Sequence, residues 1–177
     1  SLGLVGSEMC IRDRHCVKLP RHVASRQASA AKHFLQLKGF KNVEISEEFY
    51  PPEKDPHLGP GSGIVLWAHT SSGTILGADA LGSPGKPAEK VGEEAATKLV
   101  EELSSGAAVD CHMGDMLIPY IALASGLSEI KVSKLTLHAQ TAIAVVEKFL
   151  DVRFAVHGGL DKVSTISVTG VGFTKRK

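Results

Sequence analysis

Residues 88–103, AEKVGEEAATKLVEEL, carry the clearest pattern in the chain. Val91, Ala95 and Leu99 recur at helical spacing, so the stretch predicts an amphipathic helix with one apolar face. Pro87 suits the first turn of that helix, because a proline there removes no helical hydrogen bond. A well-patterned helix among short apolar runs indicates a mixed α and β architecture.

Upstream of this helix, a β-hairpin is expected. Its strands are residues 64–69 (IVLWAH) and 74–80, and SSG at 71–73 is the turn between them. Residues 22–37 have helical spacing, and residues 42–45 (NVEI) predict a short strand. The first half of the chain is therefore expected to combine helix and sheet.

Downstream, helices and strands alternate. Asp110 is expected to cap a helix that runs from there through Met113 to Gly126, and a second helix is expected at about 138–150. The expected strands are 129–135, 152–156 and 163–171. The pattern predicts an α+β or α/β protein. SPGKP at 83–87 is the strongest turn signal in the chain, and we expect the domain boundary there.

The first 14 residues, SLGLVGSEMCIRDR, show neither a helical nor a strand period, and they lack the pattern of a signal peptide. We expect them to be a non-native leader and leave them out of the expected fold.

Composition narrows the class of protein. The 177 residues are 43% hydrophobic and 22% charged, which is typical of a globular domain. The net charge of +1 gives no overall basic field for nucleic acid. No apolar run approaches the roughly 20 residues of a membrane helix. Three cysteines without a CxxC pair fit a reducing compartment, so a soluble cytoplasmic protein is expected.

Residues 107–126, AAVDCHMGDMLIPYIALASG, form a turn followed by a helix start. Free N–H groups and a positive dipole end make such a start suitable for an anion. The chemically active side chains there are Asp110, His112, Asp115 and Met116. Gly114 would allow a ligand close approach. A capping aspartate and a small residue at a packing contact explain the same residues equally well.

His138 follows a β-rich run and stands at the start of the helix expected at 138–150. The dipole of a helix N-terminus disfavours imidazolium and favours the neutral, nucleophilic ring. A histidine that merely caps or packs is the other interpretation. The remaining histidines show no metal-ligand spacing. GPGSG at 59–63 precedes a strand, so it does not fit a phosphate-binding loop.

These residues resemble the RNA 3'-terminal phosphate cyclase family. The specific match is TLHAQTAIAVVEKFL at 136–150, supported by SGAAVD at 105–110, LPRHVASRQ at 19–27 and GPGSGIVLWA at 59–68. The resemblance runs from about Leu19 to Val171.

The resemblance implies an ATP-dependent ligase that acts on RNA. His138 would attack the α-phosphate of ATP, releasing pyrophosphate and leaving an adenylylated histidine. AMP would then pass to an RNA 3'-phosphate, and the 2'-hydroxyl would displace it to form a 2',3'-cyclic phosphate, with Mg²⁺ assisting. The partners implied are ATP and an RNA with a 3'-phosphate end.

The resemblance also implies a nucleotide-binding segment. Its residues are His112, Met113, Gly114, Asp115 and Met116. The commonest pattern of the family has Tyr in place of His112 and Gln in place of Met116, whereas Asp115 matches. An imidazole can still stack on adenine, and a methionine can make soft contacts with it.

Family members are about twice as long, so the resemblance implies a fragment that lacks an N-terminal half and is inactive alone. Residues 15–84 would be part of an inserted α/β domain, and 85–177 the last βαβαββ-like repeat of a catalytic domain. The alternative is the non-catalytic, ribosome-assembly branch of the family, which lacks the histidine. The presence of His138 favours the enzyme.

Overall fold

The computed structural model of the chain describes residues 8–11, 14–45, 48–49, 56 and 58–174. It divides into two compact units, Ser1–Ser104 and Ser105–Lys177. Each unit combines helices with a β-sheet, which confirms the expected α+β class.

The sheet of the first unit is built around the hairpin of β5 (Gly61–His69) and β6 (Ile75–Leu81). Two strands follow one another along the other edge of β5. β1 (Glu8–Ile11) pairs with its end at Trp67–His69, and β2 (Arg14–Val17) with its start at Gly61–Ile64. The outermost strands are β3 (Val43–Ile45), parallel to β1, and β4 (Glu48–Phe49), parallel to β2.

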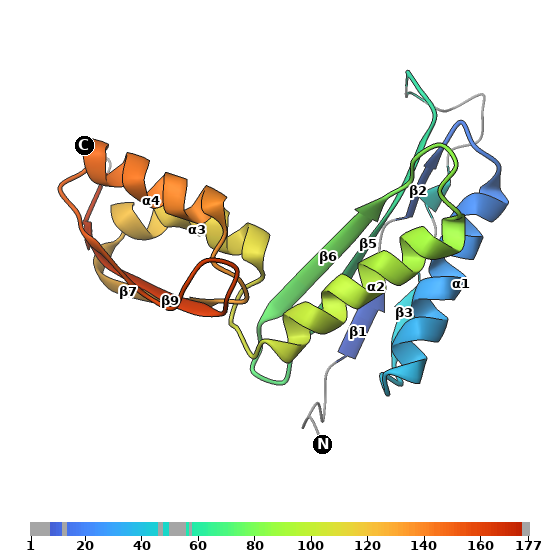
Figure 1. The fold of residues 1–177 in the computed structure, drawn as a ribbon, viewed down its shortest axis with the longest axis horizontal. Helices are drawn as coiled ribbons and strands as arrows, with labels where there is room; N and C mark the ends of the chain where they lie inside the picture. Colours follow the sequence, from blue (N-terminus) through green and yellow to red (C-terminus); the bar gives the residue numbers. More distant parts are fainter. Residues whose placement is uncertain (1–7, 12–13, 46–47, 50–55, 57, 175–177) are drawn as a thin grey trace. The chain divides into compact units, whose positions relative to one another are not determined.

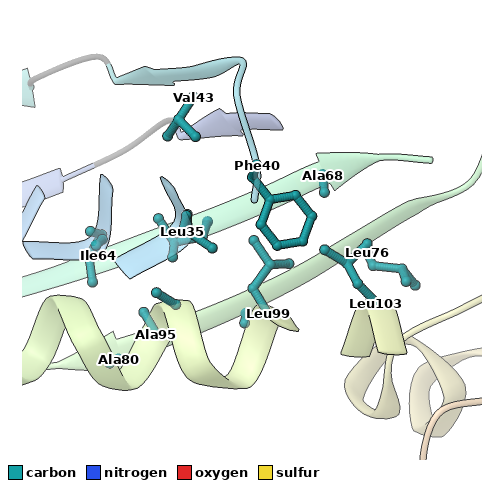
Figure 2. Close-up of a cluster of buried hydrophobic side chains, with 14 of the residues drawn as sticks. Leu35, Phe40, Val43, Ile64, Ala68, Leu76, Ala80, Ala95, Leu99 and Leu103 are labelled. Carbon is teal, nitrogen blue, oxygen red and sulfur yellow. The ribbon is translucent and has the colours of Figure 1, made fainter. Parts of the chain in front are cut away.

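Helices α1 (Arg21–Leu37) and α2 (Ala88–Ser104) cover one face of this sheet (Figure 1). The side chains of β5 and β6 alternate, so Ile64, Leu66 and Leu76 are fully buried under the helices. Leu35 of α1 and Leu99 of α2 meet them in a continuous apolar core, shown in Figure 2. Apolar burial of this extent is the main force that holds a helix layer on a sheet.

The two helices of the first unit approach closely at Gly92. A Cβ built on Gly92 would lie 1.9 Å from the carbonyl oxygen of Gln27 and 3.1 Å from the backbone nitrogen of Ala31. Only a residue without a side chain lets the backbones of α1 and α2 come this near.

Two features of the first unit differ from the sequence predictions. Residues 8–11 form a strand that pairs with β5, in a segment for which the sequence predicted no strand. Residues 1–7 and 12–13 lie outside the described residues. The expected boundary after residue 84 also moves, because α2 packs on β5, β6 and α1 and belongs with the first unit.

The second unit has a sheet in the order β7 (Ser125–Val132), β9 (Ser164–Val171) and β8 (Phe154–His157), all antiparallel to their neighbours. Helices α3 (Cys111–Leu123) and α4 (Leu137–Phe149) pack side by side and with the strands enclose a second core (Figure 1). Ile118, Leu135 and Ile166 are its large buried side chains. The helices expected after Asp110 and at 138–150 are thereby confirmed, but α3 ends at Leu123 and not at Gly126, because β7 begins at Ser125, earlier than the strand expected at 129–135.

Gly170 of β9 lets the carboxyl end of α3 rest on the sheet. A Cβ at this position would lie 2.2 Å from the carbonyl oxygen of Ala124 and 2.7 Å from that of Ile121. The glycine is needed here for space, because the opposing atoms are backbone and cannot rotate away.

Candidate active site

The N-termini of α3 and α4 lie at the same end of the second unit. Val109, just before α3, forms a parallel bridge with Val132, the last residue of β7. The N–H of Ser133 then donates to the carbonyl oxygen of Val109 at 3.2 Å. Because α4 starts a few residues after Val132, its first turn also lies at this end. The site predictions of the sequence fall on these two helix starts.

Asp110 caps the start of α3. Its carboxylate accepts from the N–H of Met113 at 2.8 Å, and its carbonyl oxygen accepts from the N–H of Gly114 at 2.9 Å. The capping interpretation of this aspartate is therefore confirmed, as the sequence pattern allowed. Three of the residues that follow have exposed side chains: His112, Met113 and Met116.

Thr136 caps the start of α4 in the same way. Its hydroxyl oxygen accepts from the N–H of Ala139 at 3.0 Å, and its carbonyl oxygen accepts from Gln140 at 3.1 Å. His138 is the second helical residue and is exposed. His112 is likewise the second residue of α3, so each helix presents an imidazole two positions after its cap.

A hydrogen bond joins the two helix starts. The hydroxyl of Thr136 donates to Oδ1 of Asp115 at 2.5 Å, and Asp115 itself is half-buried. A short bond of this kind is expected where the acceptor is a charged carboxylate. The sequence did not single out Thr136; the signal for it was a threonine directly before an apolar helical run, the usual position of an N-cap.

Gly114 serves packing in this structure. It is buried, and a Cβ at this position would lie 2.7 Å from Cγ1 of Val132. Its missing side chain lets α3 lie close against β7, which brings the start of α3 to the end of that strand. Of the five residues expected to bind nucleotide, three have exposed side chains: His112, Met113 and Met116. Asp115 is half-buried and Gly114 is buried.

The helix starts combine two kinds of charge, the positive ends of α3 and α4 and the carboxylates of Asp110 and Asp115. The N-termini of two neighbouring helices each carry a partial positive charge and N–H groups without helical acceptors. His112 and His138 are exposed in the first turns of these two helices. The arrangement suits a phosphate-bearing ligand and a nitrogen nucleophile beside it.

Among the residues that the structure describes, no three His, Cys, Asp or Glu side chains come together in a way that could hold a metal ion. GPGSG at 59–63 lies at the start of β5 in the first unit and contributes nothing to the helix starts. Over the same described ranges, no helix is long and apolar enough to cross a membrane.

The family comparison matches residues 14–104 to the insert domain of RNA 3'-terminal phosphate cyclase (RTC). This match ends where the first structural unit ends.

Proteins named RNA 3'-terminal phosphate cyclase match across most of the chain. The one from Ignicoccus hospitalis is 57% identical over 158 residues, which is 89% of this chain and 44% of that protein. Those from Desulfurococcus amylolyticus and Korarchaeum cryptofilum are 54% and 52% identical over 162 and 158 residues, covering 90% and 89% of this chain and 45% and 44% of theirs. The chain thus spans less than half the length of these relatives.

Proposed function

The chain belongs to the RNA 3'-terminal phosphate cyclase family, and on that premise we propose that it is the C-terminal part of an ATP-dependent enzyme that converts an RNA 3'-phosphate into a 2',3'-cyclic phosphate. His138 is the proposed nucleophile. The observation that carries the proposal is its position: an exposed imidazole in the first turn of α4, a turn that the hydrogen bond from Thr136 to Asp115 ties to α3.

In the first proposed step, a nitrogen of the His138 imidazole attacks the α-phosphorus of ATP. The bond from that phosphorus to the bridging oxygen breaks, and pyrophosphate leaves with the electron pair. Imidazole suits this role because it is both a good nucleophile and a good leaving group, so one difficult displacement becomes two easier ones. The positive ends of α3 and α4 would stabilise the negative charge that gathers on the phosphoryl oxygens.

In the second proposed step, an oxygen of the RNA 3'-phosphate attacks the phosphorus of the histidine-bound AMP and releases His138. The RNA 2'-hydroxyl then attacks the 3'-phosphorus, AMP leaves, and the cyclic phosphate forms. His112 and Met116 are the proposed contacts of the adenine, since both are exposed one helical turn apart on α3. Met113 is proposed to border them.

Mg²⁺ enters this proposal with ATP, bound to its phosphates, as is usual for this ion. The described residues do not fit a metal site of their own, because no three suitable ligands come together. No step is therefore assigned to a metal centre of this chain.

The experiment that tests the proposal is intact mass after incubation with ATP and Mg²⁺. It uses the chain joined to the upstream half of the Ignicoccus hospitalis relative, here called the extended protein. A gain of one AMP is expected, and it should be lost in His138→Ala. His33→Ala is the matched control, since His33 is an exposed helical histidine of the first unit and should leave the adduct intact.

Two outcomes would contradict the proposal. An adduct that persists in His138→Ala would mean that another residue is the nucleophile. A folded extended protein that gains no AMP would favour the non-catalytic, ribosome-assembly branch of the family.

A further inference from the structure

Thr136, two residues before His138, makes two side-chain hydrogen bonds. The Thr136 hydroxyl donates its proton to Oδ1 of Asp115 at 2.5 Å, and the same oxygen accepts from the N–H of Ala139 at 3.0 Å. A hydroxyl has a single proton, so these two bonds together fix the rotation of the Thr136 side chain. His138 lies between Thr136 and Ala139 in the chain. The direction of its side chain therefore depends on a helix turn that is tied to α3.

The backbone carbonyl of Asp115 lacks its usual helical hydrogen bond. Pro119 lies inside α3, four residues after Asp115, and has no N–H to donate to the Asp115 carbonyl. A helix that lacks one of its bonds bends most easily at that point. The contact from the Asp115 side chain to the cap of α4 holds this part of α3 against the neighbouring helix.

We propose that Asp115 is a positioning residue, which holds Thr136 and through it the first turn of α4, so that the His138 imidazole faces the N-terminus of α3. The inference rests on the proposed function in taking His138 as the nucleophile. It differs from the role that the family resemblance implies for Asp115, a contact with the nucleotide. Oδ1 is instead occupied by the hydroxyl that caps the nucleophile's helix.

The first test uses the 177-residue chain and needs no activity. In Asp115→Ala and Thr136→Val, the amide hydrogens of Ala139 and Gln140 should exchange faster with solvent, and the Cε1–Hε1 NMR signal of His138 should shift or broaden. Asp115→Asn should keep the wild-type signals, because an amide oxygen can still accept from Thr136.

Asp151→Ala is the matched control, since Asp151 is an exposed carboxylate of the same unit. It should leave the His138 signal and the exchange of Ala139 unchanged. A His138 signal that is identical in Asp115→Ala and in the wild-type chain would overturn the inference.

The second test measures AMP transfer to His138 in the extended protein. Asp115→Ala should lower the rate at saturating ATP by roughly 10- to 100-fold, the loss expected when a reacting group is misplaced by about 1 Å. The ATP concentration that gives half the maximal rate should not change, and Asp115→Asn should recover most of the rate.

A double variant separates the two roles of Asp115. If it acts through Thr136, Asp115→Ala with Thr136→Val should be no slower than the slower single variant. Multiplied losses, or a raised requirement for ATP at an unchanged maximal rate, would instead mean that Asp115 contacts the nucleotide. If the wild-type extended protein forms no adduct, the proposed function fails, and the NMR measurement still decides the positioning role.

Discussion

Gly92→Ala should destabilise the first unit, although alanine is the better helix former. Helix propensity alone predicts a gain of about 1 kcal/mol for this change. The added Cβ, however, would lie 1.9 Å from the carbonyl oxygen of Gln27, where an ordinary contact needs at least 3.4 Å. That oxygen is backbone, so α1 and α2 must separate by about 1.5 Å along this direction. Overpacking of a core costs about 1–3 kcal/mol, and a backbone clash lies at the upper end of that range.

The net expectation for Gly92→Ala is a loss of about 2 kcal/mol in the free energy of unfolding. With a urea dependence of about 2 kcal/mol per molar, the midpoint should fall by about 1 M. Trp67, the one tryptophan of the chain, lies on β5, so its fluorescence reports the unfolding of this unit.

Thr97→Ala is the control for helix propensity, because Thr97 is exposed on the same helix. It should leave the urea midpoint unchanged or raise it slightly. A midpoint of Gly92→Ala at or above that of the wild-type chain would refute the close approach of α1 and α2.

Two further predictions concern charge and exposed apolar surface. Hydrogen bonds from Lys86 and Lys98 lower the pKa of the Glu94 carboxyl, so their stabilising effect is present above the carboxyl's ordinary pKa and is lost as pH falls through the lowered one. Between pH 7 and about pH 3, the urea midpoint of the wild-type chain should therefore fall further than that of Glu94→Gln, and equal falls would contradict the ion pairing. In the second unit, Leu127 and Phe149 are 74% and 83% exposed, so the sedimentation coefficient should rise with protein concentration and rise less in Leu127→Asp. One concentration-independent monomer would contradict this.

Local patterns were sufficient to predict most helices and the hairpin of the first unit. The apolar spacing of residues 88–103 and the position of Asp110 before a helix are local signals, and both agree with the structure. The turn at 71–73 is equally local, because Gly73 adopts a positive φ of 81° that a glycine accepts readily.

Long-range pairing could not be predicted in this way. The strand at residues 8–11 is held by β5, some sixty positions later, and nothing in its own composition indicates that partner. The boundary between the units differs from the expected one for the same reason. SPGKP is a strong local turn signal, but the first unit ends only after α2, because that helix packs on the sheet.

The sequence predicted which residues belong to the candidate site, but not how they are arranged in space. His112 and His138 could each be placed at a helix start, since caps and apolar periods are visible in the sequence. That the two helix starts lie at one end of the sheet depends on the bridge between Val109 and Val132. The bond between Asp115 and Thr136 follows from that register and has no signature of its own.

The packing of α2 also determines how the protein can be dissected. A cut within SPGKP at 83–87 would remove α2 from the sheet. This helix carries Val91 and Leu99, which are both fully buried. The apolar face of β5 and β6 would then meet water, and the shortened piece should aggregate on expression. A cut after Ser104 leaves each sheet with its own helices, so it is the division that gives two pieces suited to separate study.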